Sequence, residues 1–146
     1  VSRNVKEAKI VGNIVNALSP KEVDVKILTP YNSQKSHLQK TLRKYLRWIC
    51  TVDEFQGREA DIIILSLVRN NRSTISGRRW GFLRDPTRLN VMFSRAREIL
   101  IVVGSLTHIF DTEFYPDETE LRGVAERFRS KAKIIKPDDI SREMEL

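Results

Sequence analysis

The chain has 146 residues, of which 40% are hydrophobic, and carries a formal net charge of +7. This size and composition fit one globular domain with an ordinary core. No apolar run reaches the roughly 18 residues of a membrane helix, so we expect no membrane contact. The lone Cys50 excludes an internal disulfide and suits an intracellular location. The excess of basic over acidic residues favours a polyanionic partner, although a solvated basic surface explains the charge equally well.

The first third of the chain predicts two helices and a strand. Residues 4–18 carry apolar side chains at the three-and-four spacing of an amphipathic helix. Residues 23–28 alternate and then become fully apolar, which indicates a strand entering a core. Residues 33–47 place apolar side chains on one face and lysines and arginines on the others. The last segment therefore predicts a basic amphipathic helix.

Two strands and a polar turn follow. Residues 48–52 predict a short strand and residues 62–68 a longer one. Among residues 62–67 only Ser66 is not aliphatic, which is typical of a strand buried on both faces. The polar, glycine-bearing turn between the strands is therefore held next to a core strand, where ligands of open α/β sheets often bind.

Residues 69–84 differ from the rest because arginine recurs among Asn, Ser and Gly. Loops beyond about 12 residues in a compact domain are usually functional or disordered, and guanidinium groups suit phosphates. A surface excursion without a function is the alternative. Asp85 and Pro86 supply a helix N-cap and first turn, so we expect a helix over residues 86–96.

The remaining residues predict an aliphatic strand at 99–103, a helix at 116–129, a last strand at 133–135 and a polar tail from residue 136. Strands thus alternate with helices. That order predicts an α/β fold with a mostly parallel sheet covered by helices on both faces.

Three polar sets accompany these elements, at residues 29–34, 53–59 and 88–97. A tyrosine ring can lie against a flat base, a glutamine amide both donates and accepts, and a glycine lets the backbone approach a ligand. Each set taken alone fits ordinary capping, turn chemistry or surface charge. Their occurrence together in one parallel-sheet domain favours a ligand site.

The segments ILTPYNSQ, TVDEFQGREADIIILSLVRNN and GFLRDPTRLNVMFSRAREILIVVG resemble motifs IV, V and VI of the superfamily 1B helicases, in the Upf-like and senataxin-like branch. The resemblance covers about residues 4–105. It implies the second RecA-like domain of a motor, a P-loop NTPase-like three-layer sandwich over residues 1–136, with residues 137–146 as a polar tail. The chain has no G-x-x-x-x-G-K-[ST] loop, so it looks like part of a longer helicase.

The resemblance also implies roles at the nucleotide. Tyr31 would stack on or beside the adenine, and Gln34 would shape the nucleotide end of motif IV. Lys35 stands where some relatives carry an arginine that reaches the phosphates, and it keeps the charge without the bidentate fork.

In motifs V and VI, Gln56 and Gly57 would face the γ-phosphate, and Glu59 would accept a ribose hydroxyl. Arg95 matches the arginine finger and acts with Gln56 in catalysis, and Arg88 would support the helix or the cleft.

The nucleic-acid contacts implied are Thr51 and Val52, together with four arginines of the loop: Arg69, Arg72, Arg78 and Arg79. The resemblance implies ATP with Mg²⁺ as cofactor, the Mg²⁺ being held by a first RecA-like domain of the same parent polypeptide, and no metal ligand in this chain. The implied partner is single-stranded DNA or RNA, and we expect a monomer.

The competing hypothesis is a non-catalytic nucleic-acid-binding or protein-docking module derived from a helicase. The basic helix and the arginine-rich loop would support it. A decayed motor should have lost some nucleotide-facing residues, whereas Gln56, Glu59, Arg88 and Arg95 are all present.

Overall fold

The computed structural model describes residues 3–18, 23–68, 85–105, 123, 126–127 and 130–144. Its elements, in chain order, are α1 (Val5–Leu18), β1 (Val25–Thr29), α2 (Asn32–Thr41), η1 (Arg43–Trp48), β2 (Ile49–Thr51), β3 (Ala60–Ser66), α4 (Pro86–Ser94), β4 (Ala96–Val103), η4 (Pro137–Asp139) and α7 (Ile140–Glu143).

The four strands form one sheet in the order β2-β1-β3-β4, and every neighbouring pair is parallel. The register places Ile27 beside Ile49 on one side and beside Ile64 on the other. Because all strands run the same way, their carboxyl ends share one edge of the sheet. The loops after β1 and β2 therefore begin at the same edge.

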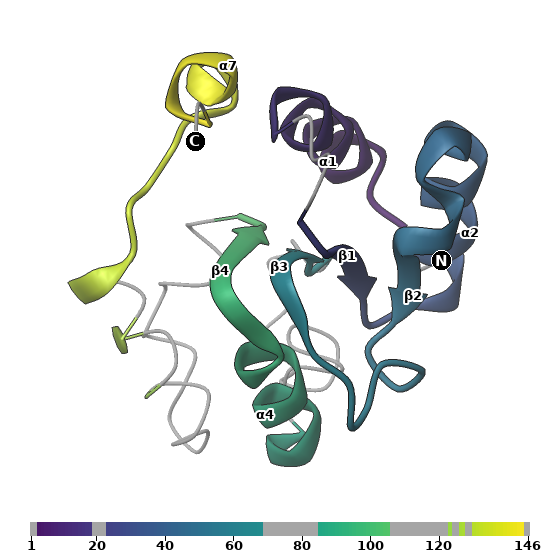
Figure 1. Ribbon diagram of the computed structural model, residues 1–146, viewed down its shortest axis with the longest axis vertical. Coiled ribbons are helices and arrows are strands. Elements are labelled where there is room, and N and C mark those ends of the chain that lie inside the picture. The colour runs from purple at the N-terminus through teal and green to yellow at the C-terminus, as the bar shows by residue number, and fades with distance from the viewer. Residues whose placement is uncertain are drawn as a thin grey trace, which may run out of the picture.

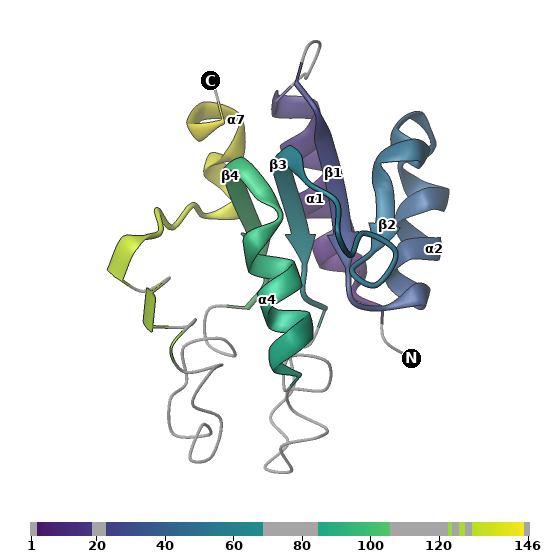
Figure 2. The ribbon, with the colours of Figure 1, turned by 60° about the horizontal axis from the view of Figure 1, so that its bottom comes forward.

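Helices cover both faces of the sheet, with α1 on one side and α4 on the other (Figure 1). Alternate residues of β3 supply the two cores: Ile62 and Ile64 pack with α1, whereas Ile63 and Leu65 pack with Val91 of α4 and its neighbours. The α/β, RecA-like fold with a parallel sheet between helical layers is thus confirmed. The tilted view in Figure 2 shows α4 lying along the sheet beside β3 and β4.

The structure corrects two predicted elements. The basic helix expected over 33–47 ends at Thr41, because Leu42 leaves helical geometry (φ −120°, ψ 53°) and a separate 3₁₀ segment, η1, follows. The strand expected at 133–135 does not form: these residues pair with no strand of the described chain, and the Lys133 ammonium instead contacts the Glu143 carboxylate.

The predicted polar tail has two short helical segments, η4 and α7. Ile140 and Met144 are buried in the core that α1 forms with the sheet. The arginine-rich loop over 69–84 and most of the helix expected at 116–129 lie outside the described residues. Within the described ranges, no helix is long and apolar enough to cross a membrane.

Candidate nucleotide-binding face

The polar turn between β2 and β3 is built around one buried aromatic ring. Phe55 is fully buried in the core beneath α4, and its N–H donates to the carbonyls of Thr51 and Val52 at 3.2 Å each. Gly57 adopts φ +80°, which closes the turn and is costly for other residue types. The anchored ring leaves Gln56, Gly57 and Glu59 exposed on the turn.

Lys35 of α2 is joined to this turn by an ion pair. Its ammonium donates to both carboxylate oxygens of Glu54, at 2.7 and 2.9 Å. Glu54 also accepts from the Thr51 hydroxyl at 2.9 Å and from the Thr51 N–H at 3.3 Å. The hydrogen bond from Lys35 lowers the pKa of Glu54, so the carboxylate stays charged at neutral pH. The ammonium of Lys35 is thus matched by a carboxylate of the protein itself.

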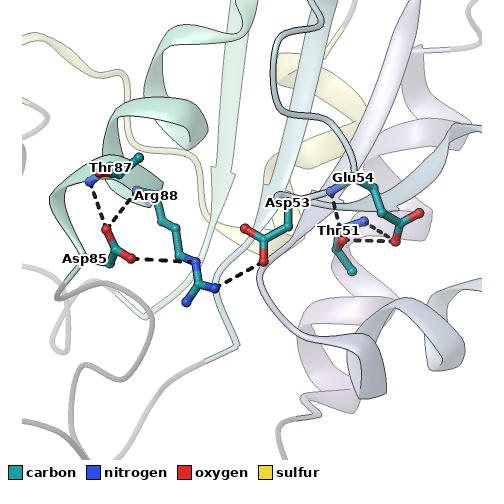
Figure 3. Close-up of polar contacts among 6 residues, drawn as sticks. All are labelled: Thr51, Asp53, Glu54, Asp85, Thr87 and Arg88. Atoms are coloured by element: carbon teal, nitrogen blue, oxygen red, sulfur yellow. Dashed lines mark hydrogen bonds and ion pairs between the residues drawn. The ribbon is translucent and has the colours of Figure 1, made fainter.

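Arg88 ties the first turn of α4 to the same loop (Figure 3). Its Nη2 donates to Oδ2 of Asp53 at 3.2 Å, and its Nε lies 3.7 Å from Oδ2 of Asp85. Asp85 caps α4 by accepting from the N–H groups of Thr87 and Arg88 at 2.9 and 3.3 Å. The predicted cap is confirmed, and Arg88 is fixed between two carboxylates.

Arg95 directly follows the last residue of α4. It lies where the loop over residues 52–59 ends, whereas Arg88 lies where that loop begins. Its carbonyl accepts from the N–H of Ala60 at 3.1 Å, and Ala60 pairs with Ala96 in the register of β3 and β4. Glu59 and Arg95 therefore immediately precede paired residues of adjacent strands. The Arg95 guanidinium is half-buried and donates to the Ser94 hydroxyl at 2.9 and 3.2 Å.

Arg97 binds elsewhere. Its Nε donates to Oδ1 of Asp61 at 2.9 Å, and its Nη2 lies 3.5 Å from Oδ2 of Asp24. The bond from Arg97 lowers the pKa of Asp61. Arg97 thus joins the starts of three strands and stands apart from the Arg88 contacts.

A buried polar network lies behind the turn and joins α1, α2 and the end of β3. Gln34 is fully buried: its Oε1 accepts from the Asn4 N–H at 2.8 Å, and its Nε2 donates to the Asn4 carbonyl at 3.0 Å and the Ser66 hydroxyl at 3.2 Å. Glu7 accepts from the Ser66 hydroxyl at 2.8 Å and from the Val68 N–H at 3.0 Å. Burial raises the pKa of Glu7 despite these bonds.

The structure limits what several of the predicted site residues can contact. The Gln34 amide is committed to internal bonds, so its support of the nucleotide loop would be indirect. Thr51 and Val52 are only 7% and 1% exposed as whole residues, so little of either reaches the surface where a nucleic acid could bind. The four arginines predicted to bind the strand, Arg69, Arg72, Arg78 and Arg79, lie outside the described residues.

Sequence reasoning missed the partners of these side chains. Asp53 and Glu54 were visible as an acidic pair, yet nothing local indicates that one binds Arg88 and the other Lys35. Glu7 had a usable signal: it precedes Val11 by four residues and Ile14 by seven, so it falls on the apolar face of α1. A carboxylate at such a position needs donors, and those donors come from residues about 60 positions away.

Comparison with known proteins identifies the family. A family model described as an AAA domain matches residues 2–107. DNA polymerase alpha-associated DNA helicase A of Saccharomyces cerevisiae is 46% identical over 89 residues, which cover 58% of this chain and 12% of that protein. Probable helicase senataxin of Homo sapiens is 37% identical over 122 residues, covering 77% of this chain and 4% of that protein.

Regulator of nonsense transcripts 1 of Dictyostelium discoideum is 41% identical over 114 residues, covering 70% of this chain and 8% of that protein. The chain thus spans a small share of the length of each of these relatives.

Proposed function

Because its AAA-domain match covers residues 2–107 and its relatives are helicases, this chain belongs to the superfamily 1B helicases, and we propose that it is the second RecA-like domain of an ATP-driven motor on single-stranded nucleic acid. In this role it completes a nucleotide site whose phosphate loop lies on a first motor domain. The Mg²⁺ of the nucleotide would likewise be held by that first domain.

One observation supports this proposal above the others: the turn over residues 52–59 and helix α4 are fixed side by side at both ends. Asp53 and Arg88 join them at one end, and the bond from Ala60 to the Arg95 carbonyl joins them at the other. Between these ties Gln56, Gly57 and Glu59 are exposed. Donors, an acceptor and a cation thus occupy one preorganised surface, the arrangement that electrostatic catalysis requires.

The residues of this face have chemistry that fits a nucleotide. The carboxylate of Glu59 can accept a ribose hydroxyl, and the Gln56 amide can orient an attacking water or contact a phosphate. At Gly57 the space around the missing side chain is open, so the backbone can approach a ligand closely. Among the described residues no group of three His, Cys, Asp or Glu side chains could hold a metal ion.

Arg95 would act as the arginine finger. Among the described residues its guanidinium hydrogen bonds only to the neutral hydroxyl of Ser94, so no described carboxylate has to be displaced before it meets a phosphate. When the two motor domains close on ATP, this cation would offset the negative charge that develops on the transferring phosphoryl group. Opening after hydrolysis would then change the grip on the strand.

The test is made in a protein that carries both motor domains. Arg95→Ala should lower kcat for strand-stimulated ATP hydrolysis by roughly a thousandfold while strand affinity changes little. The matched control is Arg97→Ala, which removes an arginine two positions away that binds Asp61 and Asp24. We expect this control to retain hydrolysis, and both activities are measured by phosphate release and fluorescence anisotropy.

Equal loss of hydrolysis and strand binding in Arg95→Ala would show that Arg95 is structural. Unchanged hydrolysis in Arg95→Ala would contradict the arginine-finger role. Lack of strand-stimulated hydrolysis in the unmodified two-domain protein would contradict the motor assignment and favour the non-catalytic nucleic-acid-binding or docking module.

A further inference from the structure

The Lys and Arg side chains of this chain differ in whether an Asp or Glu side chain pairs with them. No Asp or Glu lies between Asp24 and Asp53, and that interval contains six cations: Lys26, Lys35, Lys40, Arg43, Lys44 and Arg47. Lys26 is paired with Asp24, and Lys35 is paired with Glu54. The other four are exposed and form no ion pair with any residue in the described part of the chain. These four, Lys40, Arg43, Lys44 and Arg47, are called here the η1 basic patch.

The patch is carried by a rigid support. In η1, two short turns meet at Tyr45, whose backbone leaves helical geometry (φ −110°, ψ 20°). The Tyr45 and Trp48 rings lie 4.7 Å apart between centroids and pack against the core that contains α1. The Tyr45 hydroxyl also donates to Asn16 of α1 at 3.4 Å. Because the aromatic pair faces inward, the cations of η1 are presented to solvent.

An apolar side chain stands among these cations. Leu46 is 48% exposed, and it lies between Lys44 and Arg47 in the sequence. The Lys44 ammonium lies 5.6 Å from the centre of the Tyr45 ring, which places its charge over that ring. The surface therefore combines unpaired positive charge with apolar area. That combination suits a flexible polyanion with both phosphates and apolar faces.

The patch lies next to β2, an edge strand of the described sheet, whereas Glu59 and Arg95 of the proposed nucleotide face immediately precede β3 and β4. η1 directly precedes β2, so it lies at the amino ends of the parallel strands, whereas Tyr31 and Asp53 follow the carboxyl ends of β1 and β2. Acidic residues at that amino edge, Asp24 and Asp61, bind Lys26 and Arg97. In the described part of the chain, neither of these two carboxylates forms an ion pair with the patch.

We propose that the η1 basic patch is a second contact for single-stranded nucleic acid, separate from the strand path of the motor. Phosphates bind Arg43, Lys44 and Arg47, and Leu46 contacts a sugar or base. This contact does not depend on ATP, so it stands whether the chain is a motor domain or a non-catalytic module. It would hold a strand segment on the outside of the domain.

The test compares two triple variants of the chain with equal loss of charge. In Arg43→Ala/Lys44→Ala/Arg47→Ala the slope of log affinity against log salt for oligothymidylate should fall by about 2, since each phosphate contact contributes about 0.7 for single strands. Oligouridylate should give the same result. The matched control is Arg3→Ala/Lys6→Ala/Lys9→Ala, which removes three exposed cations on or just before α1. Its slope should change by less than half as much.

Equal slopes for the two triple variants would mean that only diffuse charge is involved, and would overturn the proposal. Circular dichroism melting establishes that each variant is folded. A charge-retaining variant, Arg43→Lys/Arg47→Lys, should keep the slope of the unmodified chain. Loss of binding in that folded variant would contradict a contact made through backbone phosphates.

A second readout reports the location of the contact directly. Trp48 and Trp80 are the tryptophans of the chain, so Trp80→Phe leaves Trp48 as the single reporter. Saturating oligothymidylate should quench its emission, and the Arg43/Lys44/Arg47 triple variant in this background should lose that response. Unchanged Trp48 emission on strand binding would place the strand elsewhere.

Competition then separates nucleic acid from an acidic protein partner. Oligothymidylate should displace bound labelled strand at far lower concentration than polyglutamate of equal charge. Equal displacement would assign the patch to acidic polypeptides and overturn the proposal. Arg95→Ala should leave the Trp48 response intact, so failure of the motor assignment and failure of this contact are distinguishable.

Discussion

Glu7 is the only charged residue that is buried in the described part of the chain. It is 5% exposed within a helix face that otherwise packs on the sheet, and it binds donors from Asn4, Ser66 and Val68. Those bonds compensate the carboxylate only in part, because burial still raises its pKa. Its carboxylate holds the segment just after β3 through the N–H of Val68, a residue that adopts φ +72°.

The raised pKa of Glu7 predicts how stability changes with pH. Between the ordinary value of 4.5 and the raised value, the folded state binds a proton that the unfolded state has released. The free energy of unfolding should therefore rise as the pH falls from 7.5 towards 5. Glu7→Gln removes the titration, so the advantage of the unmodified chain over this variant should be larger at pH 5. Urea unfolding at the two pH values measures the difference.

The carboxylates with lowered pKa, Glu54, Asp61 and Glu143, lose their stabilising pairs only below their ordinary values and so do not obscure this range. An identical pH dependence in both proteins would show that Glu7 stays ionised throughout.

Single helices and strands of this fold were predictable where one local residue pattern determines where the element forms. The aliphatic runs gave β3 and β4, and the Asp85-Pro86 pair gave the start of α4, because burial and capping are local demands. The break after Thr41 was not predictable, since the apolar spacing continues through Leu42, Tyr45 and Leu46. There the aromatic pair packing against α1 decides the backbone path.

The ion pairs between side chains of different elements could not be predicted from the sequence. Lys35 meets Glu54 because β2 lies next to β1 in the sheet, which brings the loop after β2 against α2. The resemblance identified Lys35, Arg88 and Arg95 as candidates, but the carboxylates that hold two of them follow only from the order of the strands.

The Lys35–Glu54 pair predicts competition at the proposed nucleotide face. In a protein with both motor domains, Glu54→Gln should tighten binding of a fluorescent ATP analogue by about two- to fivefold, since an exposed pair is worth up to ~1 kcal/mol. The ammonium would then be available to a phosphate. Lys35→Gln should weaken binding, and the double variant should resemble Lys35→Gln.

Glu143→Gln breaks a comparable lysine–glutamate pair between Lys133 and α7 and serves as the control. It should leave nucleotide affinity unchanged. Weaker binding in Glu54→Gln would instead mean that the pair holds α2 and the turn in place for the nucleotide.

At the scale of the whole molecule, the chain resembles one of two motor domains that together form a nucleotide site. The proposed finger and ribose acceptor lie on one face, and no G-x-x-x-x-G-K-[ST] loop occurs in the sequence. We therefore expect the purified 146-residue chain to bind ATP weakly and to give no steady-state turnover above buffer. Phosphate release in the presence of oligothymidylate measures this. Turnover that disappears in Arg95→Ala would show that the chain carries a complete site.

The bonds of Gln34 have a mechanical consequence. One side-chain amide grips both the N–H and the carbonyl of Asn4, as a neighbouring strand would, and also contacts Ser66 of β3. Tension applied to the chain before Asn4 is therefore borne in part by that amide and passed to β3. The stiffness of this attachment point depends on Gln34 together with the bonds of the Asn4 side chain to Glu7 and Val68.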